Sequence, residues 1–245
     1  MNALEVDRVS FSYGDFQALE QISFQVRHGQ VNALLGPNGA GKSTLIALLS
    51  RLYRLQEGDI RVSGMSLRRQ PRKALRKLGV VFQQSTLDLD LSVYQNLAYH
   101  AALHGMNTRT AAPRIEEELT RQSLLEHQHK RVRQLNGGHR RRVEIARALL
   151  HDPDILLLDE ASTGLDPASR LALNQHIRSL CEERQLTVVW TTHLMDEVAQ
   201  EDPVIMLYRG RILAQDNAAS IIARTGQASL SDAFRDITHC SGPTP

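Results

Sequence analysis

The chain has 245 residues, of which 42% are apolar and 23% charged, and its 29 basic and 27 acidic side chains leave a formal net charge of +2. This composition excludes an intrinsically disordered chain, and it does not favour a general nucleic-acid binder, which needs a basic footprint. A chain of this length can bury one large α/β core or two small ones.

The first third of the chain alternates apolar and polar residues with the two-residue period of β-strands. Residues 31–35 are mostly apolar, which indicates a central strand buried on both faces. After a glycine-rich turn, residues 43–51 place their leucines on one face and predict a helix. Further strands are expected over 4–11, 22–26, 60–62 and 80–82.

From about residue 85 to residue 150 the apolar residues recur at helical spacing, and Ser92 can cap the first helix. We expect a mostly helical insert there. A helix is also predicted from Pro167 to about residue 184, because proline suits the first turn of a helix. Strands are predicted over 155–158, 187–190 and 204–207. Alternation of strands and helices predicts an α/β fold with a doubly wound, mostly parallel sheet.

Membrane insertion and secretion are not expected from the sequence. No apolar run approaches the roughly 18–20 residues of a membrane-spanning helix. Glu5 and Asp7 lie where a secretory signal has basic and then apolar residues. Cys181 and Cys240 form neither a disulfide framework nor a paired zinc spacing. We therefore expect a cytoplasmic protein that reaches a membrane through a partner.

A phosphate-binding loop is predicted at residues 36–43, which match G-x-x-x-x-G-K-[ST] between an apolar strand and a helix. Its glycines permit positive φ, so backbone N–H groups can turn towards an anion at the positive end of the helix. We expect Lys42 to reach the β and γ phosphates and Ser43 to ligate Mg²⁺. The expected contacts to the nucleotide here are Gly36, Pro37, Asn38, Gly39, Ala40, Gly41, Lys42, Ser43 and Thr44.

Two carboxylates, Asp159 and Glu160, end the apolar strand predicted at 155–158. In a parallel sheet the ligand lies at the carboxyl ends of the strands, beside the phosphate-binding loop. Asp159 is therefore expected to hold Mg²⁺, and Glu160 to polarise the attacking water.

The segment LNGGHRRR at 135–142 opens a predicted helix and resembles the L-S-G-G-Q signature of ATP-binding-cassette (ABC) ATPases. Further motifs of that family occur in the expected order, and the resemblance spans roughly residues 4–215. These motifs are Tyr13, Gln83, the STGLD segment at 162–166, and His193.

The resemblance implies roles for single residues. Tyr13 corresponds to the aromatic residue that stacks on adenine, and Gln83 to the glutamine that ligates Mg²⁺ and senses the transport subunit. Glu160 corresponds to the general base, and His193 to the switch histidine at the γ-phosphate. The assignments of Tyr13, Gln83 and His193 depend on the family, because each of these residue types alone has a more ordinary structural role.

In this family two cassettes close head to tail around ATP. Asn136, Gly137 and Gly138 would therefore cap the ATP of a second copy, and Asp166 would act across the same interface. The resemblance thus implies a homodimer in the ATP-bound state.

The fold implied by the resemblance is a P-loop NTPase (RecA-like) core with a mostly parallel sheet, an N-terminal antiparallel β part and a helical subdomain. The ATP-binding domain would occupy residues 1–216, with the helical signature subdomain at about 85–150. Residues 217–245 would form a short C-terminal extension.

The function implied is that of an ATP-binding and hydrolysing subunit that energises a separate membrane permease, at the inner face of the cell membrane. Segments 87–97 and 229–234 resemble the drug-resistance and nodulation exporter branch. The segment 135–150 is similar to cassettes associated with pyrroloquinoline-quinone-dependent alcohol dehydrogenase systems.

Departures from the family pattern leave an alternative open. Asn136 replaces the usual serine, His139 the usual glutamine, and Ala161 a frequent proline. The alternative is a regulatory or non-transport ABC protein with weak hydrolysis. The pair His127 and His129 does not predict a metal site, because no cysteine or carboxylate stands at ligand spacing.

Two basic clusters are interpreted as solvated surface rather than as contacts to lipid or nucleic acid. They are Arg68, Arg69, Arg72, Lys73, Arg76 and Lys77, and Lys130, Arg131, Arg133, Arg140, Arg141 and Arg142.

Overall fold

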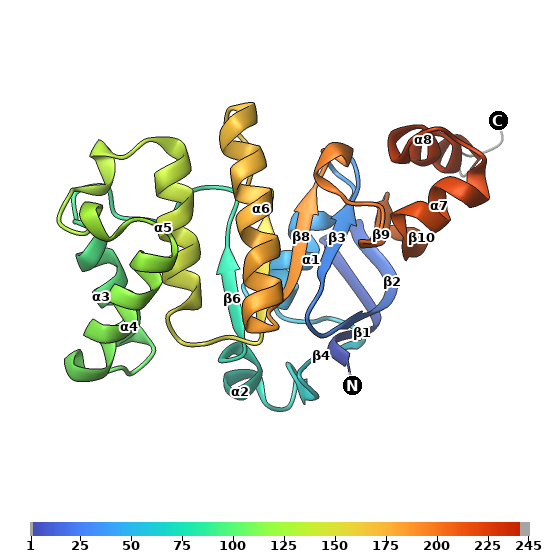
Figure 1. The fold of residues 1–245 in the computed structure, drawn as a ribbon. Coiled ribbons are helices and arrows are strands. Elements are labelled where there is room, and N and C mark those ends of the chain that lie inside the picture. Colours follow the sequence, from blue (N-terminus) through green and yellow to red (C-terminus); the bar gives the residue numbers. More distant parts are fainter. Residues whose placement is uncertain (1, 241–245) are drawn as a thin grey trace.

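The structure, a computed structural model, describes residues 2–240 and contains two β-sheets (Figure 1). A four-stranded antiparallel sheet has the order β2-β1-β4-β5, and a six-stranded sheet has the order β10-β9-β3-β8-β7-β6. The first sheet consists of β1 (Asn2–Tyr13), β2 (Phe16–Arg27), β4 (Asp59–Val62) and β5 (Met65–Ser66). The second consists of β3 (Val31–Leu35), β6 (Leu78–Val81), β7 (Ile155–Asp159), β8 (Thr187–Thr192), β9 (Pro203–Tyr208) and β10 (Arg211–Asn217).

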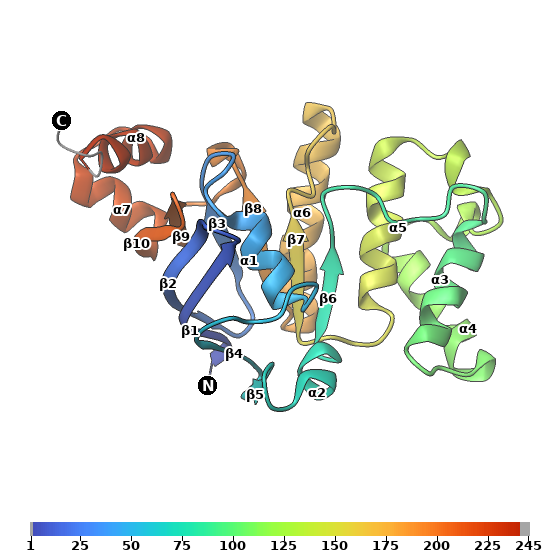
Figure 2. The same ribbon diagram turned by 180° about the vertical axis from the view of Figure 1, so that it is seen from behind.

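The helices lie around and between these sheets (Figures 1 and 2). They are α1 (Lys42–Leu49), α2 (Pro71–Leu75), α3 (Val93–Leu103), α4 (Thr108–Arg121), α5 (Gly137–Leu149), α6 (Pro167–Arg184), α7 (Ala218–Thr225) and α8 (Leu230–Cys240). Single 3-10 turns occur at Leu125–His127, Val132–Gln134 and Met195–Glu197.

The six-stranded sheet is buried on both faces. In β7, Leu156 and Leu158 pack with Leu173 of α6 on one face, whereas Leu157 packs with Leu45 of α1 on the other. Successive side chains of a strand point to opposite faces, which explains why this strand is apolar throughout. The helix α1 lies between the two sheets, so the phosphate-binding loop that precedes it is held from both sides (Figure 2).

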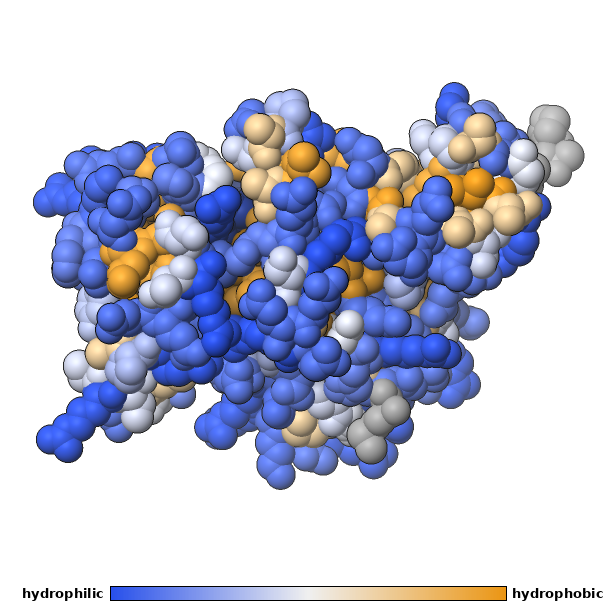
Figure 3. All heavy atoms as spheres, in the orientation of Figure 1, coloured by the Kyte–Doolittle hydropathy of each residue, from blue (hydrophilic) through white to orange (hydrophobic). Residues whose placement is uncertain are grey.

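The helices α3, α4 and α5 form a subdomain at one end of the molecule with a core of its own, which includes Val93, Leu97, Ile115 and Val143. At the opposite end, α7 and α8 cover β3 and β9 (Figure 1). Figure 3 shows apolar side chains over these two C-terminal helices.

The predicted α/β class and its parallel sheet are confirmed: β3, β6, β7, β8 and β9 pair in parallel. The helix predicted from Pro167 is present over Pro167–Arg184. The strand expected at 80–82 lies instead at Leu78–Val81, and Phe82 is outside it because its carbonyl accepts a hydrogen bond from Arg141. Two elements were not predicted: α2 within the first basic cluster, and the antiparallel edge strand β10. No helix among residues 2–240 combines the length and apolarity needed to cross a membrane.

Candidate functional site

The phosphate-binding loop connects β3 to α1 and permits two close backbone approaches. A Cβ on Gly36 would lie 2.3 Å from the Leu207 carbonyl oxygen. Gly41 has a φ of +108°, and a Cβ there would lie 2.7 Å from Leu19 Cδ2. Glycine is therefore required at both positions. Gly41 precedes α1 without a side-chain cap, so the first N–H groups of the helix remain available to an anion.

Lys42 lies in this loop with its side chain almost fully buried. Its Nζ donates hydrogen bonds to the carbonyl oxygens of Gly36, at 2.8 Å, and Pro37, at 3.2 Å. It also lies 3.4 Å from Oε1 of Glu160. The ammonium group is thus fixed at the mouth of the loop, and a carboxylate stands where a phosphate would compete for it.

Glu160 is the centre of the arrangement. Its Oε2 accepts a hydrogen bond from Gln83 Nε2 at 3.1 Å, and its Oε1 lies 3.5 Å from His193 Nδ1. The residue follows β7 with a φ of +45°, a conformation that is sparsely populated outside glycine and that clusters at functional sites. Thr191 on β8 fixes this turn, because both its carbonyl and its hydroxyl oxygen accept from the Glu160 N–H.

Asp159 lies behind Glu160 at the end of β7. Its Oδ1 accepts a hydrogen bond from Thr191 Oγ1 at 2.7 Å. Burial raises the pKa of Asp159, and the Thr191 hydrogen bond opposes that shift. The hydroxyl of Thr191 therefore links the Asp159 carboxylate to the backbone N–H of Glu160.

These side chains surround a pocket of about 510 Å³. It brings together most of the predicted nucleotide contacts: Tyr13, Asn38, Gly39, Gly41, Lys42, Ser43, Thr44, Gln83, Glu160 and His193. Phe16, Ala18 and Thr163 also line it and were missed by sequence reasoning. The Thr163 hydroxyl donates a hydrogen bond to Glu160 Oε2 at 3.5 Å. Thr163 belongs to the STGLD motif, but no contact was predicted for it. Gly36, Pro37, Ala40 and Asp159 lie outside the lining.

At one edge of the pocket, Tyr13 packs edge-on against Phe11, with ring centroids 5.0 Å apart, and against Tyr53, at 5.7 Å. The Tyr13 hydroxyl lies 3.2 Å from Thr44 Oγ1. Phe16, on the opposite side of the β1–β2 turn, exposes 67% of its surface. The pocket therefore has an aromatic edge next to its phosphate-binding end.

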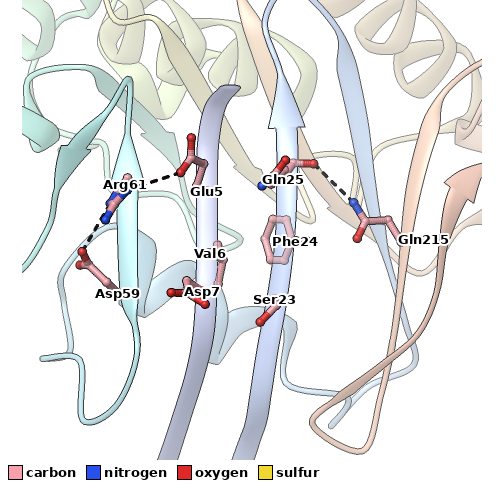
Figure 4. A pocket seen from close by; sticks show the side chains of 9 residues that line it. All are labelled: Glu5, Val6, Asp7, Ser23, Phe24, Gln25, Asp59, Arg61 and Gln215. Carbon is pink, nitrogen blue, oxygen red and sulfur yellow. Dashed lines mark hydrogen bonds and ion pairs between the residues drawn. The ribbon is translucent and has the colours of Figure 1, made fainter. Parts of the chain in front are cut away.

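A second hollow, of about 530 Å³, lies on the outer face of the antiparallel sheet (Figure 4). Its lining includes the carboxylates of Glu5, Asp7 and Asp59, and Arg61 is shared between Glu5 and Asp59 at 3.9 and 3.8 Å. Because the carboxylates outnumber the single guanidinium, this hollow does not suit a polyanion. The 510 Å³ pocket is the candidate nucleotide site.

The signature residues lie elsewhere in the chain. Asn136 caps α5 by accepting a hydrogen bond from the His139 N–H at 2.8 Å, so asparagine does here what serine does at a helix start. Gly138 faces Ser169, the residue whose N–H and hydroxyl bind Asp166 at the start of α6. These hydrogen bonds lower the pKa of Asp166. Neither Asp166 nor Asn136–Gly138 lines the pocket that contains Lys42 and Glu160.

The interpretation of both basic clusters as solvated surface is wrong for one member, Arg141. Arg68 stays exposed, as predicted, while it donates to the carbonyl oxygens of Gln56 and Gly58. Arg141 is buried: it pairs with Glu144 at 2.7 Å and donates to the carbonyl oxygen of Gln83 at 3.1 Å. The signature helix α5 is thereby bound to the segment that carries Gln83.

Replacing Arg141 by alanine is expected to lower the free energy of unfolding by about 3 kcal/mol, because it leaves Glu144 buried without its cation. Urea unfolding followed by circular dichroism would measure this loss. Arg142→Ala is the matched control, since no hydrogen bond of the Arg142 side chain is seen among the described residues. Equal losses in the two variants would contradict the structural role of Arg141.

Comparisons with known proteins agree with this geometry. The sequence pattern of the family described as ABC transporter matches residues 19–163. The daunorubicin resistance ATP-binding protein DrrA3 of Streptomyces coeruleorubidus is 37% identical over 96% of this chain and 74% of that protein. The Nod factor export ATP-binding protein I of Paraburkholderia xenovorans is 35% identical over 99% and 78%, respectively. The structure of cbiO1 from Clostridium perfringens, part of the ABC transporter complex cbiONQ, matches with a TM-score of 0.82 at 28% identity over 91% of each chain.

Proposed function

The chain belongs to the ABC transporter family, as an ATP-hydrolysing, energising subunit of an exporter-type system, and we propose that it drives a separate integral membrane permease. The observation that carries the chemistry is the position of Glu160, whose carboxylate contacts Lys42, Gln83 and His193 at 3.1–3.5 Å. No single element supplies this arrangement: the four residues come from α1, the segment after β6, and the ends of β7 and β8.

ATP would place its phosphates in the loop at residues 36–43. Lys42 Nζ then exchanges its contact with Glu160 for the phosphate oxygens, while its bonds to Gly36 and Pro37 keep it in place. Glu160, released from the ammonium group, becomes free to accept a proton from the attacking water. His193, which contacts the same carboxylate, lies where it can donate to the γ-phosphate.

Mg²⁺ fits the donor set at this end of the pocket. The Ser43 hydroxyl, the Gln83 amide oxygen and the Asp159 carboxylate are oxygen ligands of the kind that Mg²⁺ prefers, and Asp159 would act through water because it lies outside the lining. The ion would neutralise charge on the phosphate oxygens. Gln83 donates to Glu160 through Nε2, which leaves its amide oxygen for the metal.

A second copy of the chain would complete the site. The signature residues Asn136 and Gly138 line a hollow with Leu165 and Ser169, and this hollow shares no residue with the pocket of Lys42. The N-terminus of α5 opens into that hollow, and it suits an anion brought by another molecule. This separation supports an ATP-dependent head-to-tail homodimer. Each copy would consist of an ATP-binding domain over 1–216, with its helical subdomain at about 85–150, and an extension over 217–245.

The place of action proposed for the chain is the cytoplasmic face of the cell membrane, where it would be held by the permease, with no nucleic-acid partner. The burial of Arg141 supports the absence of a nucleic-acid partner, because it removes one cation from the surface that a polyanion would contact. The finer resemblance to cassettes of pyrroloquinoline-quinone-dependent alcohol dehydrogenase systems stays a prediction and names no cargo.

The permease proposal is tested by expressing the affinity-tagged chain from its own chromosomal locus. After detergent extraction of the membranes, we expect a multi-span membrane protein to copurify in stoichiometric amount. A soluble, cytosolic ATP-binding protein of the same source serves as the control for carry-over. Recovery of the tagged chain without any membrane protein would contradict a transporter role and leave the ATPase assignment intact.

A further inference from the structure

Three histidines form a cluster that the nucleotide site does not use. His100 lies in the last turn of α3, and His104 follows one turn later. His151 lies in the turn between α5 and β7, so about fifty residues of chain separate it from the other two. One ring nitrogen of each histidine lies within 4.8 Å of the corresponding nitrogens of the others, and the three side chains are partly open to solvent.

The hydrogen bonding of His151 favours one tautomer. Its Nε2 lies 2.9 Å from the carbonyl oxygen of Leu78, at the start of β6. A neutral ring donates its N–H to that carbonyl, so the other nitrogen, Nδ1, carries the lone pair. Nδ1 is buried and has no hydrogen-bond partner among the described residues. Metal-ligating histidines have this arrangement, in which one nitrogen is fixed by a carbonyl and the other is left for the ion.

The three imidazole rings are close enough to share a metal ion, but the ring of His104 has to rotate before it can coordinate one. The rings of His100 and His104 have centroids 4.7 Å apart at 50°, whereas His104 is stacked on His151 at 3.9 Å and 15°. Stacked rings cannot direct their lone pairs to one point, so His104 must rotate. That rotation is unhindered by hydrogen bonds, because none involves its side chain among the described residues. Tetrahedral zinc would bring the three nitrogens to roughly 3.4 Å of one another.

We propose that His100, His104 and His151 bind a divalent first-row transition metal ion, with Zn²⁺ as the representative case. Three imidazole nitrogens suit Zn²⁺, Ni²⁺ or Cu²⁺ and do not suit Mg²⁺ or Ca²⁺, which require oxygen ligands. Water or a small anion would take the fourth position. Asp152, which follows His151 in the chain, is paired with Arg184 and Arg114, so it is not expected to supply the fourth ligand.

The site spans a structural boundary. His100 and His104 belong to the helical subdomain, whereas His151 is hydrogen-bonded to the first residue of β6 in the central sheet. A bound ion would therefore link α3 directly to the edge of the catalytic core. Neither the phosphate-binding loop nor Glu160 contributes to it, so metal binding is independent of the proposed ATPase mechanism.

The test uses the full chain with its affinity tag removed, without nucleotide or chelator, at pH 7.5. Zn²⁺ titration calorimetry is expected to give one ion per chain, and Co²⁺ is expected to give the intense visible absorption of a tetrahedral site. His100→Ala and His104→Ala should each weaken Zn²⁺ binding at least about tenfold. His151→Ala should do the same, but it also removes the bond to Leu78, so the first two variants decide the outcome. His28→Ala, at an exposed turn, is the matched control and should bind as the wild type does.

Two results would overturn the proposal. The first is wild-type affinity in His100→Ala and His104→Ala, with native circular dichroism. The second is loss of binding on His127→Ala instead, since His127 and His139 form another ring pair, with centroids 4.9 Å apart. Absence of stoichiometric binding in the wild type would equally reject it.

Discussion

Replacing Glu160 by glutamine is expected to lower steady-state ATP hydrolysis by about 100- to 10,000-fold, the range that a positioned general base contributes. Glutamine keeps the shape of the side chain and an oxygen for Lys42, and Gln83 can turn its amide to accept from the new NH₂ group. ATP affinity should therefore change little. Phosphate release and the binding of a fluorescent ATP analogue measure the two effects separately.

The same variant is expected to accumulate as a dimer when Mg-ATP is present, because hydrolysis no longer separates the two copies. Light scattering after size exclusion would report the mass with and without nucleotide. Glu57→Gln removes the same charge at an exposed position, and this variant should hydrolyse ATP at the wild-type rate. A fall in turnover of less than tenfold in Glu160→Gln would transfer the base role to another group. A monomer with ATP bound would reject the dimer proposal and leave the base assignment standing.

Contiguous motifs predict the candidate site to the level of single residues, and part of that prediction concerns local geometry. Gly36, Gly41 and Lys42 belong to one local loop whose shape follows from glycine freedom and from the strand and helix that flank it. Asp159 and Glu160 end a strand that is apolar on both faces, and parallel strands bring their carboxyl ends to one edge. Local patterns of this kind specify local geometry, so Gly41, Lys42 and Glu160 meet at one pocket, whereas Gly36 and Asp159 lie outside its lining.

Contacts between distant segments could not be predicted in this way. Arg141 was assigned to a solvated cluster because its sequence neighbours are basic, and its burial depends on the carbonyl groups of Phe82 and Gln83, nearly sixty residues away. The histidines show the same limit. His127 and His129 are close in sequence, whereas the three histidines whose ring nitrogens lie within 4.8 Å of one another come from the end of α3 and the turn after α5.

The pairing of Lys42 with Glu160 is a further contact of this kind, and it predicts the second large effect. Lys42→Ala is expected to weaken ATP binding about 10- to 150-fold, through loss of a charge-assisted hydrogen bond to phosphate. It should also lower the free energy of unfolding of the nucleotide-free protein by about 2–4 kcal/mol, because Glu160 then remains buried without a cation. Gln83 and His193 still contact Glu160, which favours the lower part of that range.

A double-mutant cycle separates the ion pair from the loss of packing. In the Glu160→Gln background there is no carboxylate that the loss of Lys42 could leave unpaired. Lys42→Ala should therefore lower the free energy of unfolding by at least about 1 kcal/mol less than it does in the wild type. Urea unfolding of the four proteins without nucleotide gives this coupling energy. If Lys42→Ala lowers the free energy of unfolding equally in both backgrounds, within about 0.4 kcal/mol, Lys42 and Glu160 act independently. A clear coupling energy would instead show that the empty pocket is stabilised by the same two groups that ATP must separate before Glu160 can act on water.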